Sequence, residues 1–172
     1  MKALVVYESM FGNTEQIARA VAAGLEESAD VHVAEVTDAP TEPDADVALI
    51  VAGGPTHAFS MSRTNTRADA ISKGAQDGER EFGLREWMAA LPSGQHTEKM
   101  ASFDTKIESM HHLPGSAAKA AAKAARRHGY ESVVKSESFY VRDVDGPLLE
   151  GEIGRARAWG RQLAASITQA AT

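Results

Sequence analysis

The chain contains no cysteine among its 172 residues. Disulfides, iron–sulfur clusters, thiolate zinc sites and cysteine nucleophiles are therefore excluded together, and any redox chemistry must come from a bound cofactor. No apolar run approaches the roughly 20 residues that cross a bilayer. The first apolar stretch, residues 3–7, is too short for the core of a secretory signal. We expect a cytoplasmic protein.

The chain also lacks an excess of positive charge, since its formal net charge is −6. An acidic chain is a poor ligand for nucleic acid or for an anionic membrane, so neither is expected as a partner. The charge fits either simple solubility or an acidic docking face. The length corresponds to about one domain, which we expect to span residues 1–172 as a monomer.

Apolar runs of strand length alternate with amphipathic helical patterns. Helices are predicted over residues 13–27, 67–73, 84–91, 116–128 and 153–167. Strands are predicted over residues 3–7, 31–36, 47–52, 99–104 and 132–141, the last of them unbroken. Such alternation predicts an α/β fold, with a doubly wound parallel sheet of five strands and helices on both faces. The loops at the carboxyl ends of the strands then converge on one crevice.

The first of these loops, residues 8–14, joins a buried strand directly to a helix. Free N–H groups and the helix dipole attract an anion there, and Gly12 lets the backbone approach it closely. Ser9, Asn13 and Thr14 add neutral donors, and the loop has no Lys or Arg. It carries neither the Walker ending nor the three glycines of a dinucleotide fingerprint. These features favour a terminal monophosphate; the alternative is an ordinary strand-to-helix turn.

The loop after the central predicted strand, residues 53–61, contains two glycines and Pro55. Within it, His57 and Phe59 offer flat side chains. A planar ring bound at this point of the sheet would lie against them. The alternative is a structural turn with Phe59 packed in the core.

Taken together, these segments resemble the flavodoxin family. Residues 5–14 look like its phosphate loop, residues 53–57 look like its second flavin loop, and residues 146–160 look like the entry into its last helix. The similarity runs in order over nearly the whole chain. It implies a flavodoxin-like sheet of order 2-1-3-4-5, the cofactor FMN and an electron-transfer function. The unbroken last strand resembles the short-chain members.

The resemblance also implies the site residues. Ser9, Gly12, Asn13 and Thr14 would bind the FMN phosphate, and the backbone after Thr56 and after Phe103 would meet the ring. The full predicted set of cofactor contacts is Ser9, Met10, Phe11, Gly12, Asn13, Thr14, Pro55, Thr56, His57, Ala58, Phe59, Phe103, Asp104, Thr105, Met110 and His111. No metal ligand and no catalytic acid, base or nucleophile is predicted.

The chain departs from the family pattern at several of these positions. Phe11 stands where a hydroxyl residue is common, His57 where a tryptophan often stacks on the ring, and Ala58 where glycine is common. In the third loop, Met110 or His111 takes the place of a stacked tyrosine. These departures indicate weaker FMN binding and a more exposed flavin than is typical.

The main prediction is a carrier that takes electrons from a flavodoxin reductase and passes them to an acceptor protein. One alternative is an FMN-dependent NAD(P)H:quinone oxidoreductase, in which His57 or His111 faces the substrate and Arg63 and Arg67 hold the nucleotide phosphates. Another is a flavin-free binding domain of the same fold. Whether the chain is an enzyme in its own right is left open by the sequence.

Overall fold

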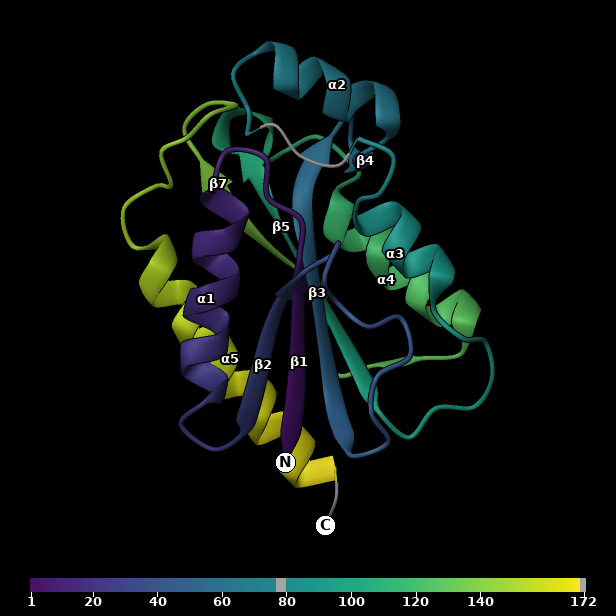
Figure 1. Cartoon of the computed structure of the whole chain (residues 1–172). Coiled ribbons are helices and arrows are strands. Elements are labelled where there is room, and N and C mark those ends of the chain that lie inside the picture. Colours follow the sequence, from purple (N-terminus) through teal and green to yellow (C-terminus); the bar gives the residue numbers. More distant parts are fainter. Residues whose placement is uncertain (77–79, 171–172) are drawn as a thin grey trace.

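The computed structural model describes residues 1–76 and 80–170. A central sheet is covered by helices on both faces (Figure 1). In chain order the elements are β1 Lys2–Tyr7, α1 Asn13–Leu25, β2 Asp30–Glu35, β3 Val47–His57, β4 Ser60–Met61, α2 Thr64–Ser72, α3 Leu84–Ala90, β5 Lys99–Ile107, the 3₁₀ turn η1 Glu108–Met110, α4 Ala117–His128, β6 Glu131–Ser132, β7 Glu137–Val141 and α5 Glu152–Ala170.

The main strands are parallel and follow the order β2-β1-β3-β5-β7. This is the predicted 2-1-3-4-5 order, with β5 as its fourth strand and β7 as its fifth. The short β6 pairs with the start of β5, and β4 pairs antiparallel with the end of β3. Among the described residues no helix is long and apolar enough to cross a bilayer.

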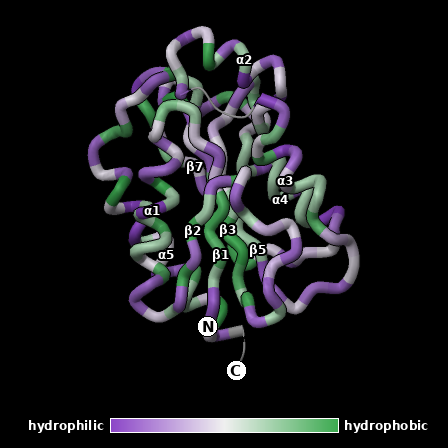
Figure 2. Tube along the Cα trace, in the orientation of Figure 1, coloured by the Kyte–Doolittle hydropathy of each residue, from purple (hydrophilic) through white to green (hydrophobic). Residues whose placement is uncertain are grey.

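Side chains along the central strands alternate between two apolar layers. Val5 faces the layer covered by α1 and α5, and its neighbour Val6 faces the layer covered by α3 and α4. Figure 2 shows hydrophobic residues concentrated along β1, β3 and β5. A parallel sheet needs apolar residues on both faces because helices cover both, which explains the continuous apolar runs in the sequence.

The strand β3 is longer than predicted, because it continues through Gly53 and Gly54 to His57. The two glycines were interpreted as turn residues, and that interpretation was wrong. They make room for neighbouring side chains. A β-carbon at Gly53 would lie 2.1 Å from the ring of Phe103, and one at Gly54 would lie 2.9 Å from Leu84.

The strand β5 also passes its predicted end and reaches Ile107. Two of the three added residues, Thr105 and Lys106, are polar yet buried, which is why their sequence looked like a loop. Lys106 is one of them, and its ammonium group donates hydrogen bonds to the main-chain oxygens of Leu113 (2.9 Å) and Gly115 (3.2 Å). Buried polar groups that find partners in this way are compatible with a strand.

The last strand is interrupted, and the prediction of an unbroken run was wrong. β6 and β7 both pair with β5, and residues 133–136 lie between them without a ladder to it. Val133 and Val134 both pack against the layer of α1 and α5. Adjacent residues of a regular strand point to opposite faces, so the chain must leave the ladder for both valines to pack on one side.

The helices α1 and α5 cross at very short range on one face of the sheet. A β-carbon at Gly160 would lie 2.2 Å from the carbonyl oxygen of Val21, and one at Gly24 would lie 2.1 Å from that of Arg157. Because no side chain fits at either position, the two glycines set the separation of the helices.

We expect Gly160→Ala to lower the free energy of unfolding by about 1–3 kcal/mol, because the added methyl group forces α5 away from α1. Gly154 lies in the same helix with no atom within 4 Å of its missing β-carbon. Gly154→Ala is therefore the matched control and should raise stability by up to about 1 kcal/mol. Urea unfolding followed by circular dichroism measures both. The same effect from both substitutions would contradict the close crossing.

Candidate functional site

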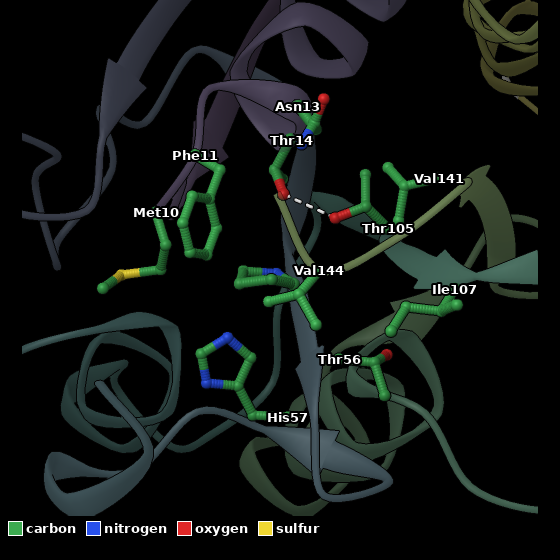
Figure 3. A pocket seen from close by; sticks show the side chains of 11 residues that line it. Met10, Phe11, Asn13, Thr14, Thr56, His57, Thr105, Ile107, Val141 and Val144 are labelled. Atoms are coloured by element: carbon green, nitrogen blue, oxygen red, sulfur yellow. Dashed lines mark hydrogen bonds between the residues drawn. The ribbon is translucent and has the colours of Figure 1, made fainter. Parts of the chain in front are cut away.

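The carboxyl ends of the main strands surround one pocket, which is where doubly wound folds place their ligands. The pocket is shallow, with about 80 Å³ of space for water-sized molecules. Phe11 enters it from the first loop and His57 from the end of β3 (Figure 3). Eight of its lining residues were predicted as site residues, namely Met10, Phe11, Asn13, Thr14, Pro55, Thr56, His57 and Thr105.

Three aliphatic lining residues were missed, and they are Ile107, Val141 and Val144. They stand at the end of β5, at the end of β7 and in the loop after β7. The signal was present, because all parallel strands end at the same edge of the sheet and the last strand was predicted to finish at Val141. The predicted contacts came only from the loops after the first, third and fourth predicted strands.

Backbone N–H groups remain free at the start of α1. The Ser9 hydroxyl oxygen accepts hydrogen bonds from the N–H groups of Gly12 (3.1 Å) and Glu15 (3.2 Å), which folds the loop back on itself. No acceptor among the described residues meets the N–H groups of Asn13 and Thr14. Free N–H groups at a helix N-terminus favour an anion, so this loop has donors available for one.

Side-chain hydrogen bonds tie the same loop to two neighbouring segments. The hydroxyl oxygens of Thr14 and Thr105 lie 2.7 Å apart and both residues are buried. The Asn13 amide donates to the carbonyl oxygen of Asp145 at 3.1 Å. Two of the three predicted side-chain donors, Asn13 and Thr14, thus have partners within the protein, whereas their backbone N–H groups meet no acceptor among the described residues.

Among the described residues, His57 is the one ionisable side chain that lines the pocket. It is partly buried and makes no hydrogen bond within the described part of the chain. Burial lowers the pKa of its imidazole, and the nearby positive charge of Arg67 lowers it further. The ring is therefore neutral at pH 7 and offers the pocket a flat, uncharged surface.

A tight hairpin follows His57 and turns the chain back into β4. His57 pairs with Ser60, and the two residues between them, Ala58 and Phe59, have φ angles of 46° and 65°. Positive φ at both central residues is typical of type I′ turns, which usually carry Asn-Gly. Each such residue costs about 1–2 kcal/mol. Arg85 supports the turn by donating to the Ser60 hydroxyl at 3.0 Å.

The other predicted ring contacts lie outside the pocket. Phe59 is 46% exposed at the hairpin tip, so the alternative that placed it in the core is wrong. Met110 and His111 are exposed at the 3₁₀ turn after β5. Phe103 packs edge-on against Phe139 in the layer of α1 and α5, with ring centroids 6.2 Å apart.

Asp104 is fully buried and faces α4 rather than the pocket. Its Oδ2 accepts hydrogen bonds from the N–H group of Ala118 (2.9 Å) and from the Thr56 hydroxyl (3.1 Å). The Thr56 oxygen in turn accepts from the N–H group of Ala117 at 2.9 Å. Asp104 and Thr56 together accept hydrogen bonds from the first N–H groups of α4. These bonds fix Thr56 at the pocket wall.

A buried charge network joins Glu8, at the start of the first loop, to α2 and α3. The Ser62 hydroxyl donates to both carboxylate oxygens of Glu8 at 2.6 and 2.8 Å, and the Leu84 N–H group donates to one of them at 3.1 Å. The Arg67 guanidinium donates to Ser62 at 2.8 Å and to Glu86 at 2.9 Å. Arg67 is 0% exposed, so the expectation that it holds nucleotide phosphates was wrong.

This arrangement defines a doubly wound α/β domain whose first strand leads through a short loop directly into a helix. Residues 5–89 match the family model described as flavodoxin. Comparison with curated protein sequences gives no significant match. The chain belongs to the flavodoxin family, as its sequence motifs predicted.

Solved flavodoxin structures superimpose on almost the whole chain. A flavodoxin from the domain Archaea shares 20% identity with a TM-score of 0.65, covering 98% of this chain and 99% of that one. Oxidised flavodoxin 1 from Bacillus cereus shares 16% identity with a TM-score of 0.65 and covers 98% of both chains. A flavodoxin from Streptococcus pneumoniae shares 22% identity with a TM-score of 0.61, covering 96% of this chain and 99% of that one.

The buried Glu8 generates a prediction about pH. Burial raises the pKa of this carboxyl above its ordinary value of 4.5 in the folded protein. Its contribution to stability is therefore complete below about pH 4.5 and is lost as the pH rises through the raised pKa. Glu8→Gln removes this titration, so the unfolding free energy of the wild type minus that of the variant should fall as the pH rises above about 4.5.

Urea unfolding at several pH values measures this difference. Glu26→Gln, at an exposed position, is the control and should stay within about 0.5 kcal/mol of the wild type throughout. A difference between the wild type and Glu8→Gln that is constant or grows with pH would contradict the buried placement of Glu8.

Proposed function

We propose that the chain binds FMN in this pocket and works as an electron-transfer protein. The observation that carries the proposal is the combination of two features in one pocket. Asn13 and Thr14, whose N–H groups meet no acceptor in the described part of the chain, line the same pocket as the flat side chains of Phe11 and His57. A ligand with a terminal phosphate at one end and a planar ring at the other matches both features.

The residues present fit FMN better at the phosphate end than at the ring end. The loop offers neutral donors for a single phosphate, and the remaining pocket walls include Ile107, Val141 and Val144. These side chains give the ring aliphatic contact in place of a second aromatic stack. FMN supplies one- and two-electron chemistry when bound, and the chain supplies position and environment.

The shape and charge of the pocket suit electron transfer. About 80 Å³ is too little space to enclose a tricyclic ring, so a ring held there keeps an exposed edge for a partner protein. The neutral His57 adds no positive charge beside that ring. A reductase as donor and a second protein as acceptor are the proposed partners.

An NAD(P)H:quinone oxidoreductase is the rival function, and the burial of Arg67 removes one of its two phosphate ligands. Arg63 is still exposed. Oxidation of NADPH with benzoquinone, in the presence of FMN and without a reductase, separates the two functions. An electron carrier should show no turnover in this assay.

The two ends of the proposed ligand generate a paired prediction. Thr14→Val removes the hydroxyl that joins the first loop to Thr105 and should weaken FMN binding about 5–30-fold, corresponding to about 1–2 kcal/mol. Riboflavin lacks the phosphate, so its affinity should change little. His57→Ala should weaken FMN and riboflavin by the same factor, because this residue faces the ring end of the pocket.

Flavin fluorescence during titration of the apoproteins measures the affinity of the wild type and of each variant for both flavins. Thr14→Ser keeps a hydroxyl and is the control, and circular dichroism verifies that each variant is folded. If Thr14→Val weakened riboflavin as much as FMN, the phosphate would not bind at this loop. If the wild type bound neither flavin, the proposed function itself would be wrong.

A further inference from the structure

The outer face of α4 carries a stripe of positive charge on an acidic protein. Lys119, Lys123, Arg126 and Arg127 are exposed at spacings of four, three and one residues, so they share one side of the helix. The opposite side consists of buried alanines that pack against the sheet. Lys135 follows on the neighbouring segment. We call these five residues the α4 basic face.

Within the described residues, no member of the α4 basic face forms an ion pair. Other exposed cations of the chain do find partners. Arg157 and Arg161, for example, both meet Glu27. A group of cations with no neutralising carboxylate creates a local positive potential that attracts an anionic partner.

The basic face borders an open groove along the edge of the sheet. Lys119, Arg126 and Lys135 line this groove together with Val133 and Val134, and it holds about 720 Å³. The groove follows residues 133–136, which leave the ladder with β5 between β6 and β7. It therefore joins cationic side chains, two partly buried valines and an irregular stretch of edge backbone in one surface.

The spread of the charges indicates the shape of the ligand. From Lys119 to Arg127 the helix rises about 12 Å, which is the length of about four residues of extended chain. A single small anion would meet only one or two of these cations. Large exposed hydrophobic side chains among the described residues are found elsewhere, at Met1, Phe59, Met110, Val144 and Ile153, which disfavours a lipid surface as the ligand. The net charge of −6 repels a long nucleic acid.

We infer that the α4 basic face docks a short, extended acidic segment of a partner protein, with carboxylates against the cations and apolar groups over the valines. This inference goes beyond the proposed FMN function. None of the five basic residues lines the flavin pocket, so a partner held here leaves that pocket open. The docking surface and the redox site are separate parts of the molecule.

Fluorescence anisotropy with a labelled hexaglutamate peptide at low ionic strength tests the inference, and hexaglutamine is the uncharged control peptide. The wild type should bind hexaglutamate, weakly and less tightly as salt is added, and should not bind hexaglutamine. Lys119→Glu/Arg126→Glu should lower the affinity at least about tenfold, as expected when attraction becomes repulsion at two contacts.

The matched control is Arg63→Glu/Arg142→Glu, which changes the net charge equally at exposed positions away from the groove. It should keep most of the affinity. Equal losses in the two double variants would mean that only net charge matters, and that outcome would overturn the inference. No hexaglutamate binding by the wild type would overturn it as well.

Sedimentation of the same proteins examines a second copy of the chain as the occupant. The inference predicts that the wild type and Lys119→Glu/Arg126→Glu sediment alike. Self-association of the wild type that this variant loses would assign the face to a dimer and would contradict the partner segment. None of these readouts depends on flavin. Failure of this inference therefore would not contradict the FMN proposal, which the flavin titrations test separately.

Discussion

The carboxylate of Glu8 is the interaction on which the binding end of the molecule depends. It follows β1 directly, and the donors that reach it come from Ser62 after the hairpin and Leu84 at the start of α3. Arg67 approaches from α2, with its guanidinium 3.9 Å from the carboxylate. One buried group thereby joins four segments of the chain. Removing one partner of such a buried pair typically costs about 3–5 kcal/mol, so a change here would disturb the loop after β1 and the segments packed against it.

Two further hydrogen bonds made by threonine hydroxyls fix the residues of the pocket walls. Thr56 donates a hydrogen bond to Asp104 on β5, and the hydroxyl of Thr14 is hydrogen-bonded to that of Thr105 on the same strand. The first loop is thus fixed to the sheet before any ligand arrives, and its remaining N–H groups keep a defined direction. A preformed set of donors spares the ligand the cost of ordering the loop, which compensates in part for the small aromatic surface that Phe11 and His57 offer.

Most of the fold was predictable from the sequence, because buried parallel strands leave long apolar runs and exposed helices leave periodic ones. The failures have specific causes. Gly53 and Gly54 look like a turn in sequence but give space to the side chains of Phe103 and Leu84. The break after β6 arises because Val133 and Val134 both pack on one layer, and periodicity alone does not reveal such long-range packing.

The site was predictable where it follows local motifs and failed where it needed three-dimensional neighbours. Residues of the first loop and the end of β3 do line the pocket. The prediction for Phe103 and Asp104 concerned the backbone after Phe103 and stays a prediction, while strand alternation sends their side chains into the two layers. The burial of Arg67 was also not predictable from the sequence, since its partners Ser62 and Glu86 contact it only in the folded chain.

The most direct test of the central claim is an NMR titration of the isotope-labelled apoprotein with FMN and with riboflavin. FMN should shift the backbone amide resonances of Asn13 and Thr14 strongly, because their free N–H groups meet the phosphate. Riboflavin should leave these two resonances nearly unchanged, while both flavins shift the signals of His57. If FMN bound without moving the amides of Asn13 and Thr14, the assignment of the phosphate to this loop would be wrong.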